Sequence, residues 1–198
     1  MTIIGITGGI GSGKSYVCQA LRKRGYAVYD TDSRAKALMV EDAQVRAELI
    51  ALFGEEVFRG GELDRKRIAS IVFHEPEQLS RLNAIVHPAV IADVQRWAEE
   101  QRGDCCFVES ALLYPSGLAR LCDRIVIVST PELTRIARIL ARDYAGADTA
   151  QNRHHIQARI RAQAAYYEPD VPADLLLNGD GSIPIEERIE QILRLVKI

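Results

Sequence analysis

Residues 8–15 read GGIGSGKS and match every position of the pattern G-x-x-x-x-G-K-[ST]. The residues before them, TIIGIT at 2–7, are apolar and β-branched, which is typical of a buried strand. The residues after them, at 17–24, have the apolar spacing of a helix. A strand, a glycine-rich loop and a helix in this order are the context in which the pattern marks a phosphate-binding loop, so a plain glycine turn is the weaker alternative.

The chemistry of such a loop assigns roles to its residues. Its glycines let backbone N–H groups approach phosphate oxygens, and the following helix turns its positive end toward the same anion. We expect Lys14 to reach the β- and γ-phosphates and the Ser15 hydroxyl to bind magnesium. Guanine-specific switches use an N-K-x-D element, and none of the five lysines follows an asparagine, which argues against a GTP switch. The loop residues predicted to contact ATP are Gly9, Gly11, Ser12, Gly13, Lys14, Ser15 and Tyr16.

Strand and helix patterns alternate along the chain, which predicts an α/β fold. Such alternation implies right-handed crossovers and one parallel sheet, with ligands outside the carboxyl ends of the strands. With 198 residues and 47% hydrophobic content, the chain is expected to form a single domain. Five apolar runs are typical of strands buried on both faces, at 3–7, 27–29, 105–108, 125–128 and 175–177.

Two regions depart from this alternation and predict a helical insertion and a lid. Residues 130–132, Thr-Pro-Glu, favour a helix start, because Thr can cap, Pro fits the first helical position and Glu complements the dipole. A second basic helix is expected at 149–166. The insertion at about 32–103 has no clear strand and shows helical patterns at 34–40, 43–53, 65–73 and 88–101. With the lid at about 138–169, the core is left with about 1–31, 104–137 and 170–198.

Acidic side chains follow two of the expected strands. Asp30 and Asp32 come at the end of the second strand, where a carboxylate can orient and deprotonate an acceptor hydroxyl. Either of them can instead cap the helix that begins near Ser33, so the pattern leaves open which one acts as the base. Glu109 ends the third strand and is a candidate for holding magnesium through water, with a strand-end acid facing solvent as the alternative.

Arginines are spaced along the two expected lid helices. Arg135, Arg138 and Arg142 recur at i, i+3 and i+7 and therefore share one side of the first helix. Arg138 and Arg142, together with the arginines at 153, 159 and 161, can clamp phosphates, and closure of such a lid excludes water from the transfer. We predict that Arg138 binds ATP and that Arg142 acts in catalysis, with a solvated helix face as the alternative for any single arginine.

His87 and Asn178 are two further candidates. His87 precedes Pro88, which is expected to start a helix, so packing at a helix start is the first interpretation of His87. Asn178 and Gly179 follow the last strand and predict a turn, whose place at the sheet edge also suits a contact with the base of ATP. The histidines show no metal-ligand spacing.

Composition argues against several classes of protein. A formal net charge of -2 disfavours a dedicated nucleic-acid binder. The four cysteines lack C-x-x-C spacing and are expected to be reduced and buried. No apolar run approaches the ~20 residues of a membrane span, and the chain opens on a strand pattern without a signal-like segment, so a cytoplasmic location is expected. The apolar pattern does not separate an oligomer interface from core and predicts no oligomeric state.

Taken together, these residues resemble the dephospho-CoA kinase family over nearly the whole chain. The resemblance lies in the extended loop from Thr7, D-x-D at 30–32, L-N-x-x-x-H-P at 82–88, R-x-x-x-R-D at 138–143 and N-G at 178–179. It implies a three-layer P-loop kinase fold that uses ATP and Mg²⁺ to phosphorylate the ribose 3′-hydroxyl of dephospho-CoA, the last step of CoA synthesis. It further implies that Asp32 is the base and that His87 lies near the acceptor.

The chain departs from the family pattern near its third strand and in its loop. The family commonly reads D-x-P-L-L-F-E where this chain begins with Glu109 and ends with Pro115, and Tyr16 stands where the loop often has Thr. Two rival functions follow from the motif alone. One is a kinase for another small hydroxyl or nucleotide acceptor, and the other is a binding protein that hydrolyses ATP to change partners.

Overall fold

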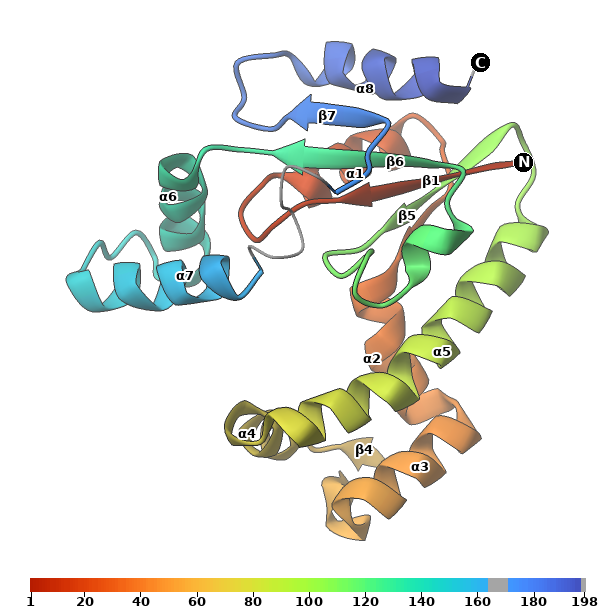
Figure 1. The fold of residues 1–198 in the computed structure, drawn as a ribbon, viewed down its shortest axis with the longest axis vertical. Coiled ribbons are helices and arrows are strands. Elements are labelled where there is room, and N and C mark those ends of the chain that lie inside the picture. Colours follow the sequence, from red (N-terminus) through yellow and green to blue (C-terminus); the bar gives the residue numbers. More distant parts are fainter. Residues whose placement is uncertain (164–170, 197–198) are drawn as a thin grey trace. The chain divides into compact units, whose positions relative to one another are not determined.

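The structure is a computed structural model, and it describes residues 1–163 and 171–196 (Figure 1). The chain divides into two compact units. The first comprises residues 1–29 together with the chain from residue 100 onward, and the second comprises residues 30–99. Among the described residues, no helix combines the length and the apolar content that crossing a bilayer requires.

A parallel sheet of five strands organises the first unit (Figure 1). β1 pairs in parallel with β5 and with β6, so that Ile6 lies opposite Glu109 on one side and Val126 on the other, and β6 pairs in parallel with β7. The predicted α/β fold with five parallel strands is therefore confirmed. In spatial order the strands are β2 (Val28–Asp30), β5 (Cys105–Glu109), β1 (Thr2–Thr7), β6 (Arg124–Ser129) and β7 (Leu175–Asn178).

Both faces of this sheet are buried, which explains why its strands read as continuous apolar runs. On one face, α1 (Lys14–Lys23) and α8 (Ile185–Leu193) pack against alternate strand residues. On the other face, Gly5 of β1 lies against Leu113 and Cys122, in a segment that includes the short helix η2 (Leu118–Leu121). The first core contains Ile4, Ile6, Phe107, Val126, Val128 and Leu177 from the strands and Val17, Leu21, Ile189 and Ile192 from the helices.

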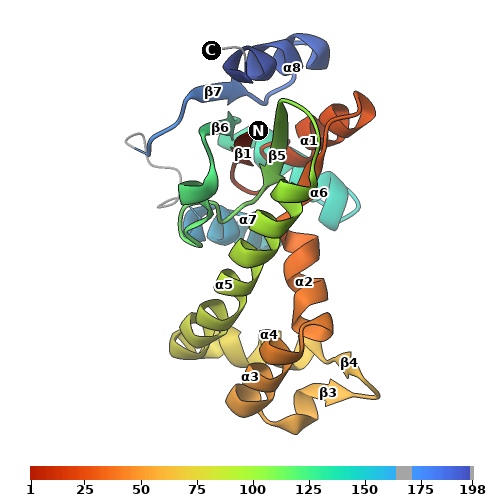
Figure 2. The same ribbon diagram turned by 90° about the vertical axis from the view of Figure 1, so that its right-hand side faces the viewer.

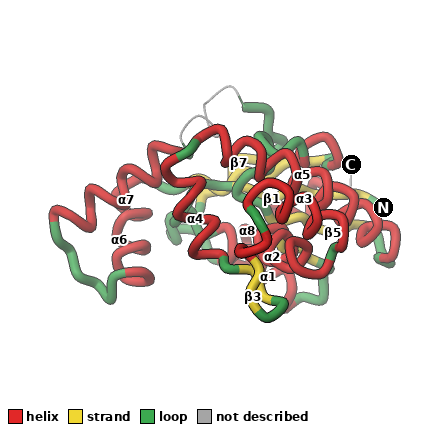
Figure 3. The backbone as a smooth tube through the Cα atoms, turned by 90° about the horizontal axis from the view of Figure 1, so that it is seen from below, coloured by secondary structure: helices red, strands yellow, loops and turns green. Residues whose placement is uncertain are grey.

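Two helices of the first unit, α6 (Glu132–Asp143) and α7 (Ala150–Ala162), pack against each other (Figure 3). The sequence predicted a helix at 149–166, and its last positions, 164–166, lie outside the described residues. The apolar part of the contact between the two helices is formed by Ile136, Ile139 and Leu140 on α6 and by Ile156 and Ile160 on α7.

The start of α6 differs from the expected capping pattern. Pro131 occupies the N-cap position, and no side-chain hydrogen bond caps the helix within the described chain. The hydroxyl of Thr130, predicted to cap α6, donates instead to the carbonyl oxygen of Ser12 at 2.8 Å. Because Thr130 is buried, its hydroxyl needs an acceptor, and the phosphate loop supplies one.

The second unit is built from four helices and a short hairpin (Figure 2). Aspartates at 42 and 64 cap α3 and α4 by accepting hydrogen bonds from backbone N–H groups. The helices are α2 (Thr31–Glu41), α3 (Ala43–Phe53), α4 (Arg65–His74) and α5 (Pro76–Glu100), and the core between them contains Val45, Leu49, Phe53, Val57 and Ile68.

Two expectations for this unit are wrong. The region was expected to lack strands, but β3 (Phe58–Arg59) and β4 (Glu62–Leu63) pair in an antiparallel hairpin. Gly60 and Gly61 form its turn with positive φ angles of 59° and 90°, which is the backbone that a two-residue hairpin turn favours. Pro88 was expected to start a helix, but it lies inside α5, which runs through it without interruption.

Candidate active site

The phosphate loop joins β1 to α1 through a backbone that requires glycine. Gly13 is the N-cap residue of α1 with φ of 94°, and Gly11 has φ of 78°, a region in which a side chain is strained. No side chain of the described residues caps α1. The first N–H groups of the helix are therefore available to an anion.

Two other loop residues predicted to contact ATP differ in exposure. Ser12 is buried, and its hydroxyl oxygen has no hydrogen-bond partner within the described part of the chain. Tyr16 is 56% exposed, and the guanidinium carbon of Arg188 lies 5.7 Å from the centre of its ring. Tyr16 therefore presents its ring to solvent at the first turn of α1.

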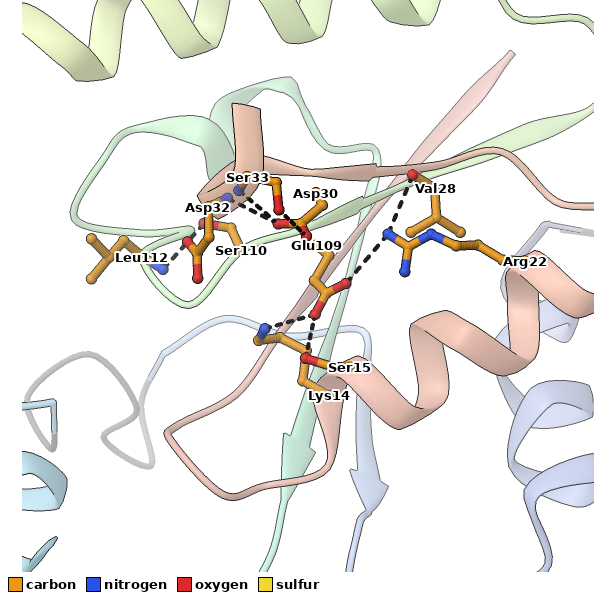
Figure 4. A network of polar contacts seen from close by, with 10 residues as sticks. All are labelled: Lys14, Ser15, Arg22, Val28, Asp30, Asp32, Ser33, Glu109, Ser110 and Leu112. Atoms are coloured by element: carbon orange, nitrogen blue, oxygen red, sulfur yellow. Dashed lines mark hydrogen bonds and ion pairs between the residues drawn. The ribbon is translucent and has the colours of Figure 1, made fainter. Parts of the chain in front are cut away.

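Glu109 is the residue on which the side chains of α1 converge (Figure 4). The ammonium of Lys14 donates to Glu109 Oε1 at 3.0 Å, and the hydroxyl of Ser15 donates to the same oxygen at 2.7 Å. Arg22 Nη2 lies 3.5 Å from the other oxygen, Oε2. Since Glu109 is only 5% exposed, the alternative that it simply faces solvent is wrong.

The pair formed by Ser15 and Glu109 has the chemistry that Mg²⁺ prefers. Both ligand atoms are oxygens, and the hydroxyl already lies 2.7 Å from the carboxylate. The described residues contain no group of three or more His, Cys, Asp or Glu side chains arranged to hold a metal ion. A site at Ser15 and Glu109 therefore fits a magnesium ion that receives its remaining ligands from phosphates and water.

Cys18 lies one turn beyond Lys14 on the same side of α1. Burial raises the pKa of its thiol far above the usual value, and the charge of Glu109 and a hydrogen bond to that carboxylate raise it further. The thiol therefore stays protonated at neutral pH. Sequence reasoning assigned no role to Cys18 or Arg22, although their i+4 and i+8 spacing from Lys14 places all three on one helix face.

Arg138 of α6 joins the phosphate loop to the loop after β7. Its Nη1 donates to the carbonyl oxygens of Gly11 and Ser12 at 3.3 and 3.2 Å. Its Nη2 donates to the carbonyl oxygens of Gly179 and Asp180 at 2.8 and 3.0 Å. Because the guanidinium is a rigid planar fork, one side chain fixes the spacing of the two loops. The predicted contact between Arg138 and ATP stays a prediction.

Loss of this link should weaken ATP binding. We expect Arg138→Met to raise the Kd of ATP by about tenfold to a hundredfold, because a hydrogen bond from a charged donor contributes about 1.5 to 3 kcal/mol and several are lost. Isothermal titration with ATP measures the change. Arg24→Met is the matched control, since it removes an exposed ion pair with Glu190 and leaves both loops untouched. Wild-type affinity in Arg138→Met would contradict the role given to this arginine.

Asn178 stabilises the loop after β7, and Arg135 of α6 contacts the phosphate loop. Asn178 accepts a hydrogen bond from the N–H of Asp180 at 2.9 Å and donates to the hydroxyl of Ser182 at 3.2 Å, which folds the loop after β7 on itself. Arg135 Nε donates to the carbonyl oxygen of Ile10 at 2.8 Å, at the tip of the phosphate loop. A predicted contact of Asn178 with the base of ATP therefore stays a prediction.

Arg142 lies at the end of α6 in an ion-pair network. Its Nε and Nη2 donate to the two carboxylate oxygens of Asp143 at 2.6 and 3.1 Å, and Arg159 of α7 donates to the same carboxylate at 3.0 Å. The hydrogen bonds from Arg142 lower the pKa of Asp143 to about 2, and the hydrogen bond from Arg159 adds to the effect. The network is therefore intact above the usual pKa of a carboxyl group and is lost only as the pH falls toward 2.

In the second unit, the two aspartates at the junction of β2 and α2 have different partners. One oxygen of Asp30 accepts hydrogen bonds from the N–H groups of Asp32 and Ser33 at 3.0 and 3.1 Å, and the other accepts one from the Ser33 hydroxyl at 2.8 Å (Figure 4). Asp30 is thus the N-cap of α2, a choice that the sequence left open. Asp32 is exposed, and within the described chain its carboxylate makes no hydrogen bond or ion pair.

His87 lies on α5, half-buried. Burial lowers the pKa of its imidazole, so the ring is neutral at neutral pH. The second unit also contains a cavity of about 830 Å³ between α2, β4 and the start of α4, and a second of about 730 Å³ between α3 and α5. His87 lines neither of them. The first cavity carries basic side chains from Lys36, Arg65 and Lys66 and acidic ones from Glu41, Glu62 and Asp64.

Comparison with known proteins places this geometry in one family. The family model described as dephospho-CoA kinase matches residues 2–184. A Porphyromonas gingivalis protein named dephospho-CoA kinase is 43% identical over 83% of this chain and 81% of its own length. A Bacteroides fragilis protein of the same name is 38% identical over 98% of this chain and 90% of its own length.

A solved structure agrees with the sequence matches. The crystal structure of a Thermus thermophilus protein superposes with a TM-score of 0.79 and 34% identity, over 98% of this chain and 96% of that one. The resemblance that the motifs carried is thereby confirmed. The chain belongs to the dephospho-CoA kinase family.

Proposed function

We propose that this chain transfers the terminal phosphate of ATP to the ribose 3′-hydroxyl of dephospho-CoA, giving CoA and ADP. The observation that carries this proposal is the cluster at the start of α1, where Lys14 and Ser15 meet the buried Glu109 beside an uncapped helix end. That cluster holds a cation, a hydroxyl and an acid at a site that is open to an anion, and these are the groups that phosphoryl transfer needs.

Lys14 neutralises charge on the β- and γ-phosphates in this scheme, and the loop glycines Gly9, Gly11 and Gly13 let the backbone N–H groups approach them. Ser15 and, through water, Glu109 would hold the magnesium ion, which would supply positive charge against the negative charge that develops on the phosphates. Fixed donors of this kind act mainly by being in place before the reaction begins.

Asp32 is the base that orients and deprotonates the acceptor hydroxyl. Its carboxylate is exposed and has no partner within the described residues, whereas the neighbouring Asp30 is occupied in capping α2. A carboxylate that keeps its acceptor capacity can take a proton from a hydroxyl that is brought to it.

The second unit binds the acceptor. Support comes from the cavity of about 830 Å³, which is lined by Ser33, next to Asp32, and carries the basic side chains of Lys36, Arg65 and Lys66 beside the acidic ones of Glu41, Glu62 and Asp64. Such a set suits a substrate that has a diphosphate and a long polar arm. His87 acts near the acceptor as a neutral hydrogen-bonding group, in line with its lowered pKa.

The arginines of α6 and α7 complete the site as a lid. Arg142 is 60% exposed and already paired with Asp143, so a phosphate that reaches it must compete with that carboxylate. Arg142 stabilises the phosphoryl group during its transfer. Arg138 stabilises the phosphate loop and the loop after β7. We assign the protein to the cytoplasm, with a small-molecule substrate and no nucleic-acid or membrane partner.

The test is an acceptor panel with one readout. With MgATP, we expect rapid formation of ADP and CoA from dephospho-CoA, and slow ADP release with shikimate, adenosine or water alone. Faster turnover of another hydroxyl compound would replace the proposed acceptor. ADP release that no acceptor accelerates would instead favour a nucleotide-dependent binding protein.

A further inference from the structure

One face of α1 is turned toward Glu109 over more than two turns of helix. Lys14, Cys18 and Arg22 recur at i, i+4 and i+8, and Figure 4 shows Lys14 and Arg22 reaching Glu109 from different parts of the helix. At a rise of 1.5 Å per residue, Arg22 lies about 12 Å along the axis from Lys14. The two side chains therefore approach the carboxylate from opposite ends of the helix, and Arg22 comes from the end that lies away from the phosphate loop.

The carboxylate of Glu109 divides these contacts between its two oxygens. Oε1 accepts from Lys14 and Ser15, whereas Arg22 Nη2 lies 3.5 Å from Oε2. Arg22 Nη2 is also held by the carbonyl oxygen of Val28 on β2 at 3.4 Å. The arginine thus connects the carboxylate to the edge of the sheet, on the side opposite to the phosphate loop.

ATP and magnesium compete with Oε1 of Glu109 for its two donors, Lys14 and Ser15. In the proposed function, the ammonium of Lys14 moves to phosphate and the hydroxyl of Ser15 to magnesium, so Oε1 exchanges both donors. A buried carboxylate is costly unless cations or donors accompany it, and one that loses its partners tends to shift. The contact at Oε2 is made by a residue that no step of the reaction needs, so it can persist through this exchange.

We propose that Arg22 is a positioning residue that holds the carboxylate of Glu109 in place while Lys14 and Ser15 are engaged by nucleotide and metal. The inference rests on the proposed magnesium role of Glu109. Arg22 itself touches neither phosphate nor metal. Its effect is therefore on metal binding rather than on the affinity for the nucleotide alone.

The test measures metal affinity directly. Mn²⁺ is the probe, and its binding to the enzyme with ADP is followed by electron paramagnetic resonance. Because loss of a group that orients a metal ligand typically costs 10- to 100-fold in affinity, we expect Arg22→Met to weaken Mn²⁺ binding by about tenfold. Metal-free binding of ADP should stay at the wild-type value. Arg22→Lys should restore most of the Mn²⁺ affinity, since it returns a cation to the same place.

Arg24→Met is the matched control. Arg24 lies two residues further along the chain and forms an exposed ion pair with Glu190, so its loss should leave Mn²⁺ affinity unchanged. Wild-type Mn²⁺ affinity in Arg22→Met would overturn the inference, as would an equal loss of metal-free ADP binding, which indicates a damaged loop. Glu109→Gln separates the two levels of the proposal. If Glu109→Gln also binds Mn²⁺ with wild-type affinity, Glu109 has no role in metal binding. If Glu109→Gln binds Mn²⁺ more weakly but Arg22→Met binds it normally, only the positioning role of Arg22 is ruled out.

Discussion

Asp32→Asn should lower kcat by about a thousandfold and leave the KM for ATP nearly unchanged, because a positioned general base contributes about 10²- to 10⁴-fold. The substitution keeps the size of the side chain and removes only its ability to accept a proton. Since Asp32 makes no hydrogen bond or ion pair within the described residues, the folded state should lose little stability. Single-turnover assays with dephospho-CoA, together with a thermal melt, measure both effects.

Asp30→Asn is the matched control for this prediction. Asparagine caps a helix about as well as aspartate, so α2 should stay intact and kcat should remain within about threefold of the wild type. If Asp30→Asn loses activity and Asp32→Asn keeps it, Asp30 rather than Asp32 is the base. Full turnover by Asp32→Asn would remove it as the base.

Lys14→Met should lower kcat/KM by about a thousandfold, because removal of one fixed donor to developing charge costs about 10²- to 10³-fold and the ammonium also binds the ground state. A second effect follows from the buried contact with Glu109. Removing one partner of a buried ion pair typically costs about 3 to 5 kcal/mol, so the free energy of unfolding should fall as well. Steady-state kinetics and urea unfolding record the two losses separately.

The double variant Lys14→Met with Glu109→Gln separates chemistry from stability. Neutralising Glu109 removes the buried carboxylate that Lys14→Met leaves with one cation fewer, so the double variant should regain much of the stability that Lys14→Met loses. Its activity should remain as low as that of the single variant. Recovery of activity in the double variant would show that the loss in Lys14→Met came from misfolding rather than from the missing cation.

The sheet and the phosphate loop could be predicted because their signals are local. Strands of a parallel sheet are buried on both faces, and the continuous apolar runs at 3–7 and 105–108 indicate such burial. The hairpin of β3 and β4 was missed because two-residue strands are too short to show alternation. Its signal was the Gly60-Gly61 pair, which supplies the positive φ angles of a tight turn.

Other features depend on contacts between distant residues and could not be predicted. Asp30 and Asp32 are both suitable caps, so the choice between them needed the backbone around Ser33. The helix start predicted at Pro88 was wrong because a proline in a long helix is costly but tolerated when packing holds both halves. The link from Arg138 to the loop after β7 joins residues 41 and 42 positions apart and leaves no trace in local sequence.

Within the described residues, the four hydrogen bonds by which Arg138 joins the two loops all end on main-chain carbonyl oxygens. A guanidinium that recognises only peptide groups is indifferent to which side chains those positions carry. Ser12 and Asp180 are therefore free, so far as this link is concerned, to change during evolution while the spacing of the two loops is kept. Divergent relatives can preserve the shape of a nucleotide pocket in this way even where the identities of its lining residues have drifted.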